Sequence, residues 1–203
     1  MLKLYYVPRT RSTRPRWMLE ELGVPYELHR VDLAAGEHRS AEYLERIQPL
    51  GRVPALTDGD VTLFESAAIV MYLADRHPEK ALAPPPDSPV RGAYYQWILY
   101  TVTELEPHCQ THWNHTVRLP EAERVPEQAA RARAAFNANL PPLERALSDG
   151  REYLLGDFSA ADVVIGWVAG WAFLSQMVDS APSLQAWSKR CSLRPASKRA
   201  RAD

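Results

Sequence analysis

The strongest constraint on the fold of this chain is a cluster of prolines in its first half. The cluster consists of Pro78, Pro84, Pro85, Pro86 and Pro89. Proline fixes φ and lacks a backbone N–H, so neither a helix nor an inner strand tolerates this density. We therefore predict a stiff linker at residues 78–89, which separates one domain at 1–77 from another at 90–203.

Short β-forming runs alternate with helical runs before the linker. Strands are predicted at 2–7, 26–33, 55–57 and 61–63. Helices are predicted at 40–47 and 66–76, and a first helix follows a cap at Ser12 or Thr13. Asp58-Gly59 is a favoured hairpin turn between the last two strands, and Gly23 ends the first helix. The order β-α-β-α-β-β-α is that of a thioredoxin-like domain.

Everything after the linker is predicted to be helical. Helical patterns cover 90–106, 126–147, 163–178, 184–190 and 195–201, with kinks or breaks at Pro107 and Pro141-Pro142. The apolar run 163–178 is shorter than the roughly 20 residues that span a bilayer, so we interpret it as the buried central helix of an all-α domain. Ser159 and Asp162 precede it with the spacing of a capping box, and loss of Asp162 is expected to cost about 1 kcal/mol or more.

Composition and charge exclude several classes of protein. The chain is 46% hydrophobic and 24% charged, with a formal net charge of -1, so nothing draws it to nucleic acid or to an anionic membrane. Two cysteines without a CxxC motif do not form a disulfide framework. The interrupted N-terminal run is no signal peptide, and a reducing, cytoplasmic location is expected.

Two short motifs suggest a site that is built mostly from the backbone. Val53-Pro54 lies between a loop and a strand, where a proline needs a special reason. A fixed, possibly cis, bond there would direct the amide and carbonyl of Val53 at a peptide-like ligand. Glu65-Ser66 opens the next helix, whose N-terminus can hold a carboxylate.

The order and spacing of these motifs resemble those of the cytosolic glutathione transferase family, over nearly the whole chain. The resemblance implies a thioredoxin-like N-terminal domain followed by an all-α domain, with glutathione as co-substrate and no metal. It also implies a homodimeric detoxification enzyme that activates the glutathione thiolate for attack on an apolar electrophile. The theta, phi and delta classes, which use a serine hydroxyl, are the most similar.

The same resemblance assigns roles to the binding residues. Val53, beside Pro54, would pair its backbone with the cysteinyl part of glutathione, and Arg52 would lie near the glycyl carboxylate. Glu65 would meet the γ-glutamyl ammonium, and Ser66 the carboxylate beside it. His38 matches a histidine at the glycyl end in theta and phi enzymes, although a surface histidine is nearly as good an interpretation.

The catalytic hydroxyl is left open among three residues. A hydroxyl at a helix N-terminus can donate to a thiolate, and the helix dipole with Arg9, Arg11 and Arg14 would favour that anion. Thr10 takes the place of the family's serine, two residues after the strand-ending proline. Ser12 and Tyr6 are the alternatives, and Ser12 can equally be a helix cap. Arg11 stands where beta-class enzymes have cysteine, so cysteine chemistry is not expected.

The helical domain would supply the walls of an electrophile pocket. The candidates are Trp97, Tyr100, His108, His112 and Trp113. For any single tryptophan or tyrosine among them, ordinary core or dimer packing is the favoured interpretation. His108 and His112 share a helix face, which permits a metal, but no further ligand completes a set.

Two rival functions are compatible with the same motifs. One is a glutathione-dependent disulfide or peroxide reductase, as in nu-class relatives whose site also offers a threonine hydroxyl. The other is a non-catalytic protein of this fold that binds ligands or acts as a scaffold.

Overall fold

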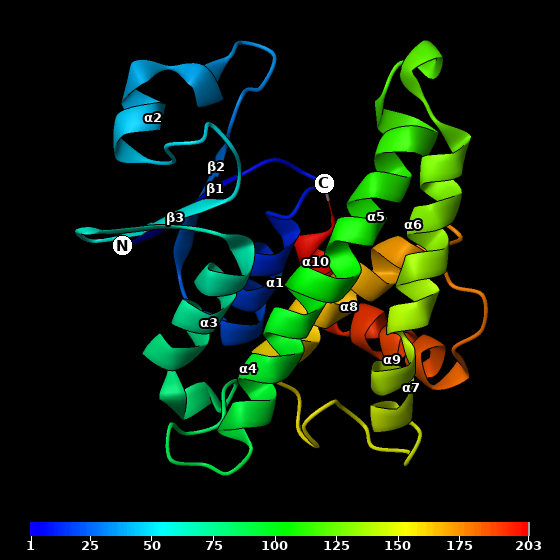
Figure 1. Cartoon of the computed structure of the whole chain (residues 1–203). Helices are drawn as coiled ribbons and strands as arrows, with labels where there is room; N and C mark the ends of the chain where they lie inside the picture. The colour runs from blue at the N-terminus through cyan, green and yellow to red at the C-terminus, as the bar shows by residue number, and fades with distance from the viewer. Residues whose placement is uncertain (203) are drawn as a thin grey trace. The chain divides into compact units, whose positions relative to one another are not determined.

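The computed structural model describes residues 1–202, and Figure 1 traces the chain from blue to red. It divides into two compact units. The first comprises Met1–Pro85 together with the segment from Leu193 onward, and the second comprises Pro86–Ser192. The division falls between two prolines of the predicted linker. The residues from Leu193 onward were expected in the helical domain but pack with the first unit.

The first unit contains a four-stranded mixed sheet. Its strands are β1 (Leu2–Tyr6), β2 (Tyr26–Arg30), β3 (Ala55–Asp58) and β4 (Val61–Phe64), in the spatial order β2-β1-β3-β4. β1 runs parallel to β2 and antiparallel to β3, so that Leu4 lies between Leu28 and Leu56. This arrangement confirms the thioredoxin-like layout. β2 is shorter than predicted, since it ends at Arg30.

Helices cover both faces of this sheet, as Figure 1 shows. α1 (Thr13–Leu22) and α3 (Ser66–Arg76) lie on one side, and α2 (Ala41–Arg46) lies on the other. Side chains alternate along a strand, so β1 sends Leu4 and Tyr6 to the side of α1 and Tyr5 to the side of α2. Leu4 and Tyr6 are buried, and the ring of Tyr5 lies edge-on to that of Tyr43.

The C-terminal helix α10 (Pro195–Ala200) is anchored to α1 by charged residues. Arg194 forms a two-pronged ion pair with Glu21, at 2.6 and 2.7 Å, and Glu21 also accepts a hydrogen bond from the Trp17 indole. Arg199 pairs with Glu20. Bidentate pairs of this kind fix orientation as well as distance. They explain why the end of the chain belongs to the first unit.

The second unit consists mainly of helices. Its α-helices are α4 (Arg91–Tyr100), α5 (Glu106–Trp113), α6 (Pro126–Asn139), α7 (Pro141–Leu147), α8 (Ala160–Leu174) and α9 (Pro182–Leu193). Two isolated β-bridges, Tyr153 to Gly156 and Leu155 to Asp157, lie between α7 and α8. Short 3₁₀ turns occur at Glu37–Arg39 and Pro78–Lys80 in the first unit and at Glu121–Glu123 in the second. α6 ends and α7 begins at the predicted Pro141-Pro142 break, where prolines are tolerated in the first turn of a helix.

The helix before Pro107 does not stop there. A π-helical turn at Thr101–Leu105 joins α4 to α5, and another at Asn114–Arg118 extends α5 at its end. Pro107 cannot donate to the carbonyl four residues earlier. A π-helical turn bonds over five residues instead, and the turn at 101–105 ends two residues before Pro107. The predicted kink therefore takes the form of a local change of helix type.

α8 is the buried central helix of the second unit. The predicted Ser159–Asp162 capping box is present and starts the helix at Ala160; the helix ends at Leu174, before the end of the apolar run 163–178. The carboxylate of Asp162 also accepts hydrogen bonds from the Leu154 amide and the Trp187 indole, both at 3.0 Å. Asp162 is completely buried.

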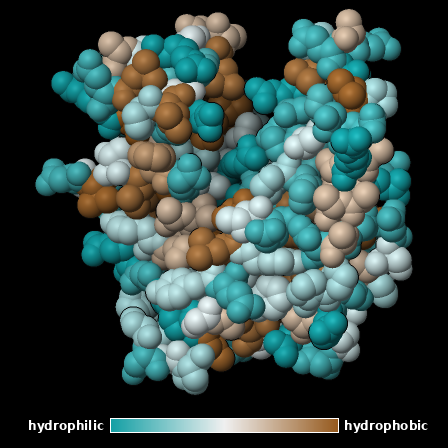
Figure 2. Space-filling view, viewed as in Figure 1, coloured by the Kyte–Doolittle hydropathy of each residue, from teal (hydrophilic) through white to brown (hydrophobic). Residues whose placement is uncertain are grey.

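Exposed hydrophobic side chains are scattered over the surface. Figure 2 shows them on the visible face as separate patches among hydrophilic residues. Leu174 is 86% exposed and Leu99 57% exposed. Within residues 1–202, no helix is both long enough and apolar enough to cross a membrane.

Candidate functional site

The loop after β1 presents a hydroxyl at the start of α1. The hydroxyl oxygen of Thr10 lies 2.7 Å from the carbonyl oxygen of Val7 and 2.9 Å from the Ser12 hydroxyl, and it accepts a hydrogen bond from the Ser12 amide at 3.2 Å. A hydroxyl carries one proton, so it can donate to only one acceptor at a time. Thr10 is partly exposed, so its hydroxyl can donate its hydrogen bond to an anionic ligand instead of to the Val7 carbonyl.

The other two hydroxyl candidates are buried. Ser12 is completely buried, accepts a hydrogen bond from the Val7 amide at 3.3 Å and makes no capping bond to α1. Tyr6 is 7% exposed, with the Arg16 guanidinium 5.3 Å from its ring centre. Ser12 therefore organises the loop, whereas Tyr6 packs against Arg16 of α1. Thr10 is the candidate whose hydroxyl combines exposure with a place at the helix N-terminus.

The segment before β3 is a tightly built turn. Its amides at Leu50 and Gly51 donate to Gln48, at 2.6 Å to the side chain and 2.9 Å to the backbone. Gly51 has φ +59° and packs so closely that an added Cβ would lie 2.7 Å from the carbonyl oxygen of His38. Only glycine fits there. The turn leads into Val53-Pro54, whose peptide bond is cis.

Glu65 and Ser66 occupy the start of α3 as the sequence suggested. Glu65 is exposed and has φ +71°, an uncommon conformation for a residue other than glycine. Ser66 is buried and is the first residue of α3. The amides of a helix N-terminus point outward and favour an anion.

Arg14 reinforces this helix end. Its side chain is 1% exposed and donates to the Ser66 hydroxyl at 3.0 Å. Its place beside Arg9 and Arg11 predicts a position near the thiolate, and in the structure its guanidinium contacts the Ser66 hydroxyl. The contact joins residues 52 positions apart. A buried guanidinium behind a helix N-terminus makes this position strongly attractive to a carboxylate.

His38 and Arg52 lie on either side of the same turn. His38 is in the 3₁₀ turn Glu37–Arg39, and its ring nitrogen Nδ1 is buried without a hydrogen-bond partner. Arg52 is exposed. Glu37 pairs with His29 at 2.6 Å and accepts from the Asp32 amide at 2.7 Å, which together lower the pKa of the Glu37 carboxyl. This pairing holds in place the turn that carries His38.

The predicted pocket residues form two groups in the second unit. The rings of Trp97 and Tyr100 meet edge-on, with centres 5.6 Å apart. The Tyr100 hydroxyl donates to the Asn139 carbonyl, and the Asn139 amide lies 3.5 Å from Nε2 of His108. Asn139, on α6, was not predicted, because no motif marks it.

The second group includes His112 and Trp113. Burial and the charge of Arg133 lower the pKa of His112, and its Nδ1 is buried without a hydrogen-bond partner. Trp113 lies edge-on to Trp171 of α8, with ring centres 6.4 Å apart, and Trp171 contacts Trp167. α8 thus contributes two aromatic rings beside Trp113 that no sequence motif marks.

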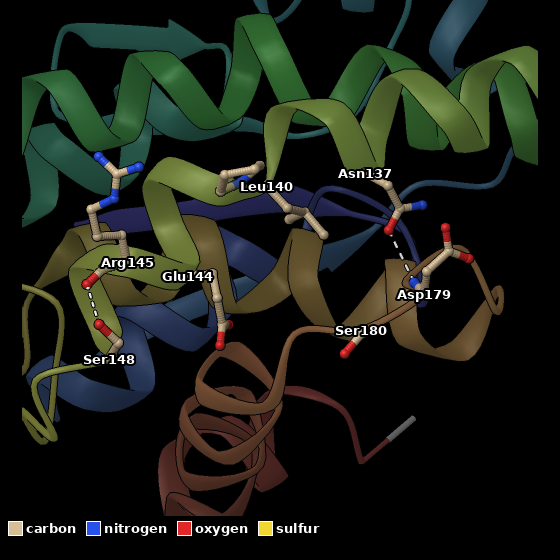
Figure 3. Close-up of a pocket in the computed structure, with 8 residues that line it drawn as sticks. Asn137, Leu140, Glu144, Arg145, Ser148, Asp179 and Ser180 are labelled. Carbon is tan, nitrogen blue, oxygen red and sulfur yellow. Dashed lines mark hydrogen bonds between the residues drawn. The ribbon is translucent and has the colours of Figure 1, made fainter.

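A cavity of about 510 Å³ in the second unit is lined by none of the predicted pocket residues (Figure 3). Its polar side chains already hold the fold together. Glu144 accepts from the Ser183 and Leu184 amides at the start of α9, both at 2.9 Å. Asn137 accepts from the Asp179 amide at 2.9 Å, the dashed line in Figure 3. We therefore do not assign the candidate chemistry to this cavity.

The structure also bears on the metal question. Among residues 1–202, no group of three or more histidine, cysteine, aspartate or glutamate side chains is arranged to hold a metal ion. Cys109 and Cys191 are both buried, and they form no disulfide in the described part of the chain.

Comparison with known proteins gives a consistent result. The model of the glutathione S-transferase N-terminal domain matches residues 1–75, and that of the C-terminal domain matches residues 126–190. The chain is 34% identical over 145 residues to glutathione S-transferase theta-1 of Mus musculus, a match that covers 70% of this chain but only 60% of theta-1. It is 31% identical over 212 residues to the disulfide-bond oxidoreductase YfcG of Escherichia coli, covering 97% of this chain and 92% of YfcG.

Solved structures of glutathione transferases have the same fold as this chain. A glutathione transferase from Methylococcus capsulatus superimposes with a TM-score of 0.85 and 32% identity, covering 100% of this chain and 98% of that one. A family member from Pseudomonas fluorescens, solved with two glutathione molecules bound, gives a TM-score of 0.85 and 26% identity, covering 98% of this chain and 91% of that one.

Proposed function

Because the chain belongs to the glutathione transferase family, we propose that it binds glutathione in its first unit and activates the thiol for attack on an apolar electrophile. The observation that carries the proposal is the start of α3, where buried Arg14 supports Ser66. This position would receive the γ-glutamyl carboxylate, with the exposed Glu65 carboxylate near the ammonium group. Homodimer formation and a cytoplasmic location belong to the same proposal.

The proposed chemistry begins with the loss of the thiol proton to solvent. The Thr10 hydroxyl would donate to the sulfur anion at the N-terminus of α1, which lowers the free energy of the anion and hence the thiol pKa. The thiolate then attacks an electrophilic carbon. An S–C bond forms, and the leaving group departs with its electron pair.

The rest of glutathione would be held mainly by backbone atoms. Val53, beside Pro54, would pair with the cysteinyl part, and His38 and Arg52 would lie at the glycyl end. The electrophile would contact aromatic and histidine side chains of the second unit. These are Trp97, Tyr100, His108, His112 and Trp113.

A glutathione-dependent disulfide reductase is the second candidate. The similarity to YfcG, which extends over 97% of this chain, favours it. In that reaction the thiolate attacks a disulfide sulfur, and a second glutathione releases the mixed disulfide as glutathione disulfide. A higher rate on hydroxyethyl disulfide than on an aryl halide would identify this activity.

The test of the primary proposal is a glutathione titration of the wild-type protein, followed by thiolate absorbance against pH. We expect saturable binding and a bound thiol whose pKa lies one to two units below the ordinary value of about 8.5 for a free thiol. Binding with an unchanged thiol pKa would instead indicate a ligand carrier or scaffold. Absence of binding would reject the glutathione site and leave only the fold.

Replacing Arg14 with methionine is expected to raise KM for glutathione about tenfold, because the γ-glutamyl carboxylate loses the positive charge behind Ser66. KM for cysteinylglycine, which lacks the γ-glutamyl group, should change little. Arg76→Met removes an exposed arginine at the other end of α3 and is the matched control for charge. An equal loss for both thiols would mean that Arg14 only supports the fold.

A further inference from the structure

A buried tyrosine on α2 is attached to the backbone turn that leads into Val53. Tyr43 is 3% exposed, and its hydroxyl donates to the Arg52 carbonyl oxygen at 2.8 Å. The backbone carbonyl of Tyr43 also accepts hydrogen bonds from the amides of Ile47 and Gln48, at 3.0 and 2.8 Å. The side-chain hydroxyl and the backbone carbonyl of Tyr43 therefore both hold the turn.

The Arg52 carbonyl belongs to the same peptide unit as the Val53 amide. Among residues 1–202 the Val53–Pro54 bond is the cis bond, so the preceding Arg52–Val53 bond is trans. A trans peptide is planar, and its C=O and N–H point in opposite directions. A hydroxyl that fixes the carbonyl on the side of α2 therefore also fixes the Val53 N–H on the opposite side.

The Tyr43 ring has a well-defined position of its own. It meets the ring of Tyr5 edge-on, with centres 6.0 Å apart and planes at 84°, and Tyr5 contacts His29 at 5.1 Å. Burial, with the charges of Glu37 and Tyr5, raises the pKa of Tyr43 to about 12. The hydroxyl therefore remains a protonated donor at every pH at which the enzyme would be assayed.

We propose that Tyr43 is a positioning residue for glutathione, and that its hydroxyl orients the Arg52–Val53 peptide so that the Val53 N–H faces the cysteinyl part of the ligand. This inference rests on the proposed function. The hydrogen bond also polarises the peptide, which makes the N–H a stronger donor. Tyr43 would not touch glutathione itself.

The test compares Tyr43→Phe with Tyr72→Phe. The first variant keeps the ring against Tyr5 and removes only the hydroxyl. Tyr72 is the matched control, because its hydroxyl donates to Asp58 at 2.9 Å in the same unit but has no part in the proposed site. Both variants should lose a similar free energy of unfolding, because each loses one tyrosine hydroxyl hydrogen bond. A difference in glutathione affinity between them therefore reflects the orientation of the Arg52–Val53 peptide.

We expect Tyr43→Phe to raise the Kd for S-methylglutathione and KM for glutathione about fivefold, the effect of one lost hydrogen bond. The limiting rate and KM for the electrophile should change less than twofold, whereas Tyr72→Phe should match wild type throughout. Unchanged glutathione affinity in Tyr43→Phe, or an equal loss in both variants, would overturn the inference while the proposed function stands. Wild-type protein that binds no glutathione would overturn the proposed function as well.

Discussion

Replacing Asp162 with alanine is expected to lower the free energy of unfolding by about 4 kcal/mol. The carboxylate accepts hydrogen bonds from the amides of Leu154 and Ser159, from the Ser159 hydroxyl and from the Trp187 indole. Alanine would leave three buried N–H donors without an acceptor, and each such donor costs about 1–3 kcal/mol. Urea denaturation followed by circular dichroism measures the loss.

Two further variants separate the capping box from a general loss of charge. Asp162→Asn keeps one acceptor oxygen and should recover part of the stability. Asp149→Ala removes an exposed carboxylate that pairs with Arg151, and it should have a much smaller effect. If Asp162→Ala unfolded at the same urea concentration as Asp149→Ala, the buried network would not be what stabilises the start of α8.

The size of this effect was only partly predictable from the sequence. The Ser159–Asp162 spacing indicates a helix start, and that part is confirmed. The bonds from Leu154 and Trp187 come from outside the motif, Trp187 from 25 positions further along the chain. Local spacing therefore predicts the cap, but it cannot predict that one carboxylate also joins a loop and α9 to the central helix.

In the candidate site, too, the sequence predicts local features but not contacts between distant segments. The hairpin of β3 and β4 and the start of α3 follow from local signals and are confirmed, but the turn of the hairpin is Gly59-Asp60, one residue later than the predicted Asp58-Gly59, because Asp58 pairs with Val61 at the end of β3. Strand alternation shows that Tyr5 and Tyr6 face opposite sides, but only the packing of the helices decides which side carries the loop of Thr10. Arg14 at Ser66 and Tyr43 at Arg52 are contacts between segments that leave no periodic signal in the sequence.

Replacing Thr10 with valine is expected to raise the pKa of the bound thiol by about one to two units and to lower kcat/KM by about 10- to 100-fold at neutral pH. The sulfur anion would lose its hydroxyl donor, so a smaller fraction of bound glutathione would be ionised. The deficit should be largest at low pH. It should shrink as the pH rises above the thiol pKa of the variant, because the thiol is then ionised in both proteins.

Two control variants make the Thr10 prediction specific. Thr10→Ser keeps a hydroxyl and should retain most of the activity. Thr13→Val makes the same change at the buried first residue of α1 and should leave the pH profile in place. The hydroxyl of Thr10 also accepts from the Ser12 amide, so a distorted loop would lower activity equally at every pH. A pH-independent loss of activity would therefore show that Thr10 shapes the loop. An unchanged pH profile of kcat/KM would mean that another group activates the thiol, and Tyr6→Phe and Ser12→Ala would then be the next variants to measure.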